Sequence, residues 1–139
     1  MVGFMQTSGG IELIAYGVLG GGFLSDKWRN KEEPDPTSAD VPPSSRKYLA
    51  MIGEAGGWVP FQAVLQACRT VADELSTALS QPVSIAQVAL AWVLTQPVVG
   101  GAIVGGGGGG SAPCVVRAAP IAAAQRFRSA VPRRGTGLK

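Results

Sequence analysis

The sequence contains no histidine among its 139 residues. Histidine is the commonest metal ligand and the usual proton carrier near neutral pH, so histidine metal sites and the common serine and cysteine triads are excluded. Only two cysteines are present, Cys68 and Cys114, and they lie too far apart in sequence to suggest a metal clamp or a redox pair. Cys68 falls on an apolar helical face, which indicates a buried thiol and favours a reducing, cytoplasmic location.

Long hydrophobic runs are also absent. Residues 9–24 are apolar near the amino end, but glycines and Glu12 interrupt them, and a membrane-spanning helix needs about 20 apolar residues. No basic segment precedes the first apolar run, which argues against a signal peptide. We therefore expect neither a membrane span nor a secretory leader.

Charged residues make up only 15% of the chain and are unevenly distributed. Residues 117–139 carry six basic residues and no acidic one, whereas residues 1–116 carry six basic and nine acidic residues. A basic tail can contact nucleic-acid phosphates, but no recognised nucleic-acid module accompanies it. A solvated, disordered end is therefore favoured over a specific nucleic-acid partner, and a basic-tailed adaptor ranks last among the alternatives.

The stretch from Gly10 to Trp28 is the most informative part of the chain. Residues 11–16 suit a buried strand, and a glycine-dense turn follows at once. A strand that runs into such a turn exposes backbone N–H groups at its carboxyl end, where ligands bind in barrels and in open α/β sheets. Residues 27–45 are expected to form a long polar loop, because prolines interrupt them.

Two longer helices follow this loop. Residues 61–79 place apolar side chains at the i, i+3, i+4, i+7 spacing of one helical stripe, and Pro60 suits a helix start. Residues 83–96 predict a second helix, in which Ser84 and Gln87 would form a capping box.

Shorter elements complete the pattern. One or two helical turns are expected over residues 46–52, and residues 102–104 form a brief strand that ends at Gly105. The order strand, helix pair, strand is the βα repeat of a parallel sheet. After residue 105 the sequence becomes glycine-rich and then basic, which is typical of a flexible linker.

Four fragments in this order resemble the aldo-keto reductase family. AYGVLGGGFL from Ala15 is similar to the family's seventh strand and the loop after it. VADELS from Val71, VSIAQVALAWVLTQP from Val83 and GAIVG from Gly101 resemble its penultimate helix, the following helix and the eighth strand. The collinear order at family-like spacing is what makes the resemblance specific. It implies an α/β fold, namely a partial (β/α)8 TIM barrel that comprises about the last two β/α units.

The resemblance divides the chain into three parts. Residues 1–9 would be a disordered lead-in, and residues 10–105 the C-terminal fragment of an NADP-dependent oxidoreductase domain. Residues 106–139 would be a glycine-rich linker and a disordered basic tail.

The implied activity is the reduction of aldehydes or ketones, or the reverse oxidation of alcohols, by hydride transfer with NADP(H). The family's catalytic tyrosine, lysine, aspartate and histidine come from the first half of the barrel, which this chain lacks. We therefore expect no catalytic residue here and no activity of the chain alone. A small carbonyl substrate and an intact reductase are the partners implied. The alternative is a non-catalytic nucleotide-binding or protein-interaction fragment.

The resemblance assigns cofactor roles to seven residues. Tyr16 matches the aromatic residue that stacks on the nicotinamide ring, and a core tyrosine ending a strand is the equal alternative. Lys27 matches a basic position near the phosphates, with a solvated surface lysine as its rival. Gly105 matches the glycine that ends strand eight. The loop that wraps the pyrophosphate through backbone N–H groups is matched by Gly17, Leu19, Gly20 and Gly22.

One part of the family's cofactor site has no counterpart. The side chains that hold the adenosine 2′-phosphate normally follow strand eight, but here residues 106–110 are all glycine. We therefore expect any affinity for NADP(H) to be weak.

Overall fold

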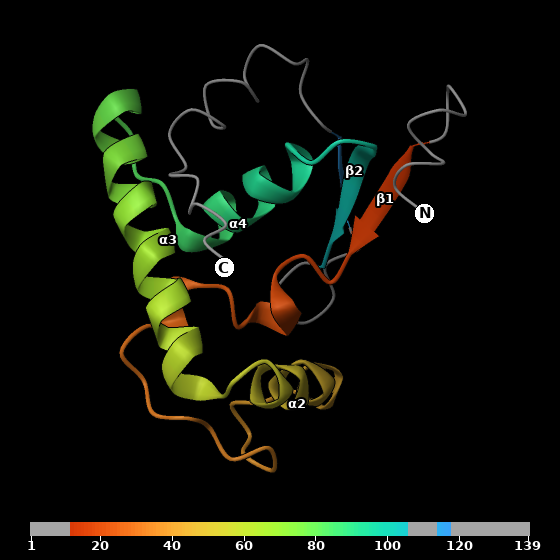
Figure 1. Ribbon diagram of the computed structural model, residues 1–139, viewed down its shortest axis with the longest axis vertical. Helices are drawn as coiled ribbons and strands as arrows, with labels where there is room; N and C mark the ends of the chain where they lie inside the picture. Colours follow the sequence, from red (N-terminus) through yellow and green to blue (C-terminus); the bar gives the residue numbers. More distant parts are fainter. Residues whose placement is uncertain (1–11, 106–113, 118–139) are drawn as a thin grey trace, which may run out of the picture.

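A computed structural model describes residues 12–105 and 114–117 of the chain (Figure 1). These residues form three strands, three α-helices and three short 3-10 helices. In chain order they are β1 (Leu13–Tyr16), η1 (Gly20–Gly22), η2 (Asp26–Trp28), η3 (Pro43–Ser45), α2 (Arg46–Glu54), α3 (Trp58–Leu79), α4 (Ile85–Leu94), β2 (Val99–Val104) and β3 (Cys114–Arg117). None of the helices in the described ranges combines the length and apolarity that a membrane crossing requires.

Strands β1 and β2 pair in parallel, with Ala15 opposite Ala102 and Tyr16 opposite Ile103. The parallel pair joined by helices is thus confirmed. The expectation that residues 11–16 form a buried strand was wrong, because the Ile14 side chain is 55% exposed and Tyr16 is 78% exposed. The physical reason is the position of β1: it lies at one end of the strand order β1-β2-β3, with no described strand beyond it.

Strand β3 corrects a second expectation. It pairs antiparallel with β2, so that Gly101 lies opposite Arg117 and Val104 opposite Cys114. The expected disorder of residues 106–139 was therefore wrong for residues 114–117, and the rest of that range lies outside the described residues. Two consecutive valines favour extended backbone, and the second edge of β2 supplies the hydrogen-bonding partners.

The predicted helices are present, with shifted ends. Helix α3 begins at Trp58, three residues before the expected start, because Gly57 turns the chain at φ +92° and Pro60 sits in the first helical turn, where its missing N–H costs nothing. The capping box of α4 is confirmed. The Ser84 hydroxyl oxygen accepts the Gln87 backbone N–H at 3.2 Å, and the Gln87 amide oxygen accepts the Ser84 N–H at 2.8 Å.

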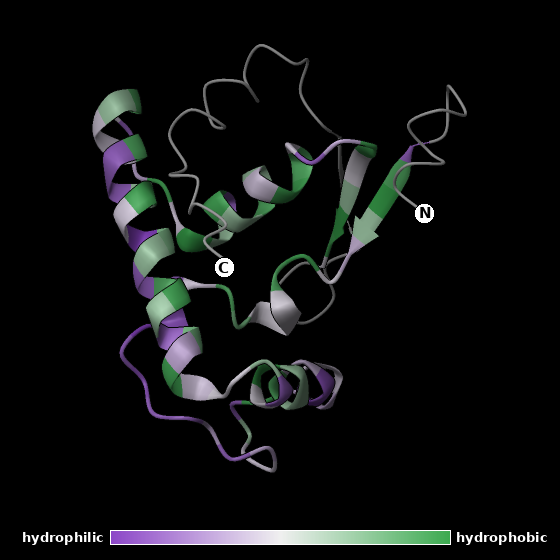
Figure 2. Cartoon of the chain, in the orientation of Figure 1, coloured by the Kyte–Doolittle hydropathy of each residue, from purple (hydrophilic) through white to green (hydrophobic). Residues whose placement is uncertain are grey.

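The main core lies between the long loop and the helices, away from the sheet. Phe23, Trp28 and Trp58 form an aromatic cluster, with ring centroids 5.1–6.1 Å apart. Four further buried side chains pack against these rings: Val41, Leu49, Leu65 and Ile85. Helix α4 contacts both α3 and β2 and so connects this core to the sheet, and its surface is largely apolar (Figures 1 and 2).

Polar side chains hold the long loop against α3. The Gln62 amide oxygen accepts the Asn30 N–H at 2.9 Å, and its nitrogen donates to the Trp28 carbonyl at 2.9 Å. The Trp58 indole N–H donates to the Lys31 carbonyl at 2.7 Å. These three hydrogen bonds hold residues 28–31 against α3. The loop therefore has a defined position although its sequence shows no hydrophobic periodicity.

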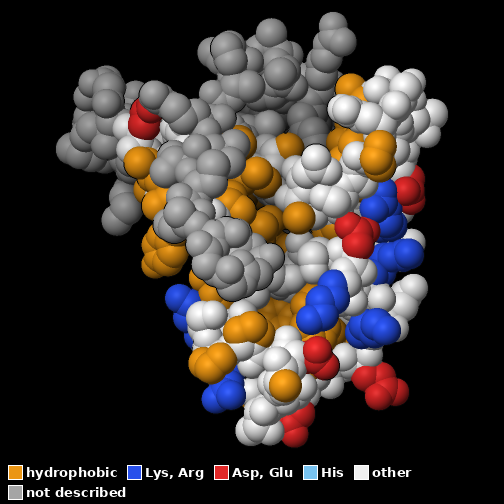
Figure 3. Space-filling view, turned by 180° about the vertical axis from the view of Figure 1, so that it is seen from behind, with side chains coloured by type: hydrophobic (Ala, Val, Ile, Leu, Met, Phe, Trp, Pro, Cys, Tyr) orange, Lys and Arg blue, Asp and Glu red, His pale blue; other side chains and the backbone are white. Residues whose placement is uncertain are grey.

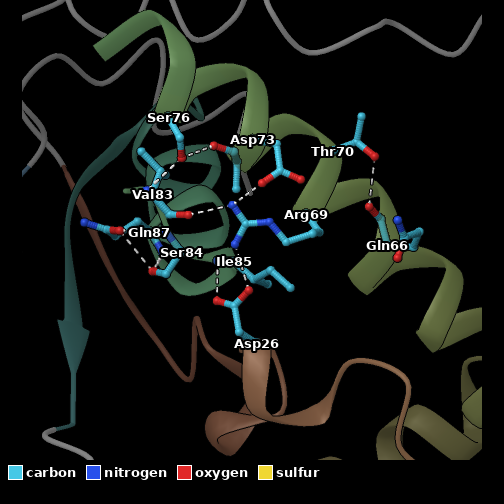
Figure 4. A network of polar contacts seen from close by, with 11 residues as sticks. Asp26, Gln66, Arg69, Thr70, Asp73, Ser76, Val83, Ser84, Ile85 and Gln87 are labelled. Atoms are coloured by element: carbon cyan, nitrogen blue, oxygen red, sulfur yellow. Dashed lines mark hydrogen bonds and ion pairs between the residues drawn. The ribbon is translucent and has the colours of Figure 1, made fainter. Parts of the chain in front are cut away.

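Arg69 of α3 ties three segments together (Figure 4). Its guanidinium donates to the Asp26 carboxylate at 2.8 Å and to the Val83 carbonyl at 2.8 Å, and it also pairs with Asp73 one helical turn away. The second oxygen of Asp26 accepts the N–H of Ile85, the first residue of α4, at 3.0 Å. Because the first N–H groups of a helix have no intrahelical partner, Asp26 caps α4 from a distant segment.

This network lowers the pKa of the Asp26 carboxyl below its usual value. Burial alone would raise that pKa, but the hydrogen bonds from Arg69 and from the Ile85 N–H, with the positive charge of Arg69, outweigh it. The ionised form is therefore the one that the fold stabilises.

Replacing Asp26 by Asn should lower the free energy of unfolding at pH 7 by about 1 kcal/mol, a small value because solvent screens a side chain that is 44% exposed. Since the pKa is lower in the folded chain, the wild type has this stabilisation above the ordinary carboxyl pKa of about 4 and loses it as pH falls through the lowered value. The variant should lack this acid-dependent loss. Urea unfolding between pH 7 and about pH 3, followed by tryptophan fluorescence, measures both curves.

Asp40→Asn is the matched control for this experiment. Asp40 lies 3.9 Å from the Lys27 ammonium, and both side chains are well exposed. The free energy of unfolding of the Asp40→Asn variant should follow that of the wild type at every pH. Equal acid-dependent losses in the wild type and Asp26→Asn would contradict the role given to Asp26.

Candidate functional site

The glycine turn after β1 depends on left-handed backbone. Gly17, Gly20, Gly21 and Gly22 have φ values of +67°, +56°, +64° and +94°. Residues with a Cβ rarely adopt these angles, so four glycines allow a tight turn directly after the strand. Because β1 and β2 are parallel, Gly105 after β2 lies at the same edge of the sheet as this turn. The two strand ends that the sequence singles out are thus neighbours.

Part of the backbone of this turn bonds to the turn itself. The N–H of Gly20 donates to the Gly17 carbonyl at 2.9 Å, and the N–H of Gly22 donates to the Leu19 carbonyl at 3.0 Å. Phe23 and Leu24 also donate back into the turn. Within the described part of the chain, the N–H groups of Val18, Leu19 and Gly21 form no such turn bond, so these three are the donors that a bound anion could use.

Tyr48 of α2 covers one side of the turn. A Cβ built on Gly17 would lie 2.5 Å from the Tyr48 hydroxyl oxygen, and one built on Gly21 would lie 2.5 Å from the ring. The Ser45 hydroxyl donates to the Gly21 carbonyl at 2.7 Å and fixes the same contact. Close approach of Tyr48 thus requires glycine at both positions. Gly22, by contrast, has no atom of the described residues within 4 Å of its Cβ position.

A groove of about 600 Å³ opens beside the turn. The groove has three walls. Two of them are formed by α2 and by the start of α3, each with lining residues at i, i+3, i+4 and i+7 spacing. The glycine turn and its flanking residues form the third wall. From α2 and its C-cap come Tyr48, Met51, Ile52 and Ala55; from the N-cap and start of α3 come Gly57, Pro60, Phe61 and Val64; from the turn and its flanks come Tyr16, Gly17, Gly20, Phe23 and Leu24. The last lining residue is Lys47.

The structure separates the seven predicted cofactor residues into groups. Tyr16, Gly17 and Gly20 line the groove together. Leu19 and Gly22 belong to the same turn, and Gly105 lies at the adjacent strand end. The seventh, Lys27, does not line the groove: its ammonium lies 4.9 Å from the centre of the Trp28 ring and 3.9 Å from Asp40.

Lys47 and Tyr48 are groove residues that the sequence did not single out as a site. Lys47 lies with its ammonium 4.8 Å from the centre of the Tyr48 ring. The available signal was the stripe of residues 48, 51, 52 and 55, which has helical spacing. That stripe shows which face of α2 is apolar, but it does not show that the glycine turn lies opposite. Only the tertiary fold supplies that information.

Substitution of Gly21 by Ala should destabilise the chain more than substitution of Gly22. Both changes put a Cβ on left-handed backbone, which costs about 1–2 kcal/mol. Gly21→Ala also forces the Cβ against Tyr48 and to 3.1 Å from the Ser45 backbone, an overpacking cost of about 1–3 kcal/mol more. Urea unfolding of the two variants measures the difference. Adding Tyr48→Ala should recover part of the loss in Gly21→Ala only, and equal losses in the two glycine variants would contradict the close packing of Tyr48 on the turn.

Of the comparisons with known proteins, the one with protein-family models gives a match. No curated protein and no solved structure is significantly similar to the chain. The family model described as the aldo/keto reductase family matches residues 1–111. The match includes β1, the glycine turn, all the described helices and β2. Since it spans well over half of the sequence, the chain belongs to the aldo/keto reductase family.

Proposed function

We propose that the chain is the C-terminal part of an NADP(H)-dependent aldo/keto reductase, with β1 and β2 as the last two strands of its barrel. The observation that carries this proposal is the parallel pairing of two strands whose carboxyl ends both lead into glycines. Ligands bind at that edge in parallel α/β folds. Family membership supports oxidoreductase chemistry, and a small carbonyl compound is the proposed substrate class.

Tyr16 in the groove and the backbone of the glycine turn fit part of the cofactor. The exposed Tyr16 ring offers a stacking surface for a planar heterocycle, and the N–H groups of Val18, Leu19 and Gly21 offer donors to a phosphate. When bound, NADP(H) supplies the hydride for carbonyl reduction. The fit is incomplete, because Lys27 is turned toward Asp40 and residues 106–110 bring no side chain for a 2′-phosphate. We therefore propose weak binding.

The chain alone should lack the proton-transfer half of the reaction. It has two tyrosines, Tyr16 and Tyr48, and no histidine. Tyr16 is the proposed stacking residue, and the Tyr48 hydroxyl lies against Gly17 of the turn. Neither occupies a place that the family resemblance gives to the catalytic tyrosine. We propose that cofactor binding survives in this chain without turnover.

A reducing, cytoplasmic setting is part of the proposal. Cys68 is a free cysteine that is partly buried against the core. Burial raises the pKa of its thiol, so the protonated form is favoured and the group is a poor nucleophile. A structural thiol of this kind persists where disulfides are rare.

The purified full chain should show no carbonyl-dependent oxidation of NADPH with 4-nitrobenzaldehyde, while the cofactor's fluorescence still reports weak binding. Tyr16→Ala should weaken that binding about fivefold, because one aromatic stacking contact contributes about 1 kcal/mol. Tyr16→Phe keeps the ring and should bind as the wild type does. Trp92→Ala removes an exposed ring outside the groove and is the matched control. Sustained turnover by the chain alone would refute the proposal of inactivity.

A second candidate function, docking onto another part of a reductase, is favoured by the exposed edge strand. Leu13, Ile14 and Tyr16 of β1 are all exposed, and Ile103 of β2 is 39% exposed. Hydrophobic side chains reach the surface on the side of the molecule where the sheet lies (Figure 3). An exposed strand edge with apolar side chains is a template for pairing with a further strand. The proposed occupant is the β/α segment that precedes β1 in a complete barrel.

Ile14→Lys should abolish this association. The experiment mixes the full chain with a separately produced segment that carries the first six β/α units of an aldo/keto reductase, and it measures complex formation by size-exclusion chromatography with light scattering. Val59→Lys is the matched control, because Val59 is 81% exposed on α3, away from the sheet. Wild type and Val59→Lys should form the complex. Equal binding by all three chains, or binding by none, would contradict docking at β1.

A further inference from the structure

The groove between the glycine turn, α2 and α3 has a chemical character of its own. Four aromatic rings line it, from Tyr16, Phe23, Tyr48 and Phe61. Between them lie small or apolar residues, including Gly57, whose Cβ position has no described atom within 4 Å and so leaves room for a flat molecule. Its volume of about 600 Å³ is typical of a small-molecule site. Such walls favour a planar, aromatic ligand.

The charge of the groove is positive. Lys47 is the one charged side chain among the described residues that line it, and no carboxylate lines it. The Lys47 ammonium contacts the Tyr48 ring face at 4.8 Å from its centre, and it forms no ion pair within the described part of the chain. An aromatic face leaves most of an ammonium's hydrogen-bonding capacity unused. This cation at the rim is therefore available to a ligand anion.

The Tyr48 side chain joins these two features. Its ring forms part of the apolar wall, and its hydroxyl lies at the turn beside Gly17. One face of the ring meets Lys47. A ligand that lies along this wall thus has an aromatic surface beneath it and a positive charge at one end, which is the arrangement that suits a flat molecule with an acidic group at its edge.

We propose that this groove is a binding site for planar aromatic anions, such as two-ring carboxylates, with Lys47 as the group that recognises the charge. The site requires no hydride transfer and no catalytic half, so it goes beyond the proposed reductase function. It shares Tyr16 and the turn with the proposed cofactor site, but Lys47 and the α2 stripe have no part in that site.

The test uses 2-naphthoate as the anionic probe and 2-naphthylmethanol as its neutral counterpart, titrated into the full chain by calorimetry. Naphthoate should bind more tightly. Lys47→Gln should weaken naphthoate binding about two- to fivefold, the range expected for one exposed charge contact, and should leave the alcohol unchanged. Lys31→Gln removes an exposed lysine outside the groove and should change neither affinity.

A second pair of variants tests the location. Met51 is 57% exposed in the groove wall, so Met51→Glu places a carboxylate there with little effect on folding and should repel naphthoate. Val59→Glu, on α3 outside the lining, is its control. Far-ultraviolet circular dichroism confirms that each variant is folded. Equal affinities for the two probes, or naphthoate binding unchanged in both Lys47→Gln and Met51→Glu, would overturn the proposal.

Titration with NADPH, followed by the cofactor's fluorescence, separates this proposal from the cofactor site. Lys47→Gln should lower naphthoate affinity and leave NADPH affinity unchanged, and Tyr16→Ala should lower NADPH affinity. If Lys47→Gln weakened the two ligands by the same factor, the groove would be part of the cofactor site and the separate anion site would be refuted. Loss of NADPH binding with retained, Lys47-dependent naphthoate binding would support this proposal and refute the cofactor proposal alone.

Discussion

The contact between Asp26 and Arg69 is the constraint on which the arrangement of the site depends. Asp26 lies four residues after the glycine turn, Arg69 is in the middle of α3, and Ile85 begins α4, so one carboxylate joins three segments. The arrangement has a cost, because the Arg69 Nε is buried without a hydrogen-bond partner among the residues that the structure describes. Two carboxylates and the Val83 carbonyl offset that cost. The network orients the segment after the turn relative to α3, whose first turns form one wall of the groove.

The main core packs against the loop after β1 and not against the sheet. In a parallel sheet covered by helices the largest apolar cluster would normally lie under the strands. Here Phe23, Trp28 and Trp58 gather between the loop and α3, while Ala102 is a small buried residue of β2. The loop after β1 is therefore held by aromatic packing as well as by the Gln62 hydrogen bonds. A rigid loop is what a site built from backbone N–H groups requires.

Local patterns predicted the parts of the fold that local physics controls. The stripe of residues 61–79 and the Ser84 capping box were sufficient for α3 and α4, because helical spacing and capping act over a few residues. The exposure of Tyr16 and the pairing of residues 114–117 depend on which strands are neighbours, and a single sequence does not contain that information. The groove could not be predicted for the same reason, because it is formed by segments that are distant in sequence. In the sequence Lys47 is one of several polar residues, and only the fold brings it to the same groove as the glycine turn.

The position of β1 at the edge of the sheet affects both the exposure of this strand and the groove beside the glycine turn. Tyr16 is the last residue of the edge strand and also a wall of the groove, so whatever covers β1 changes the surroundings of the groove. A segment that pairs with Leu13 and Ile14 would restrict the motion of the Tyr16 backbone and shield its ring from water. Docking would then change ligand affinity, and bound ligand would change docking affinity by the same factor, since coupling between two binding events is reciprocal. The weak cofactor binding proposed for the isolated chain thus follows from its uncovered edge as well as from the missing side chains at residues 106–110.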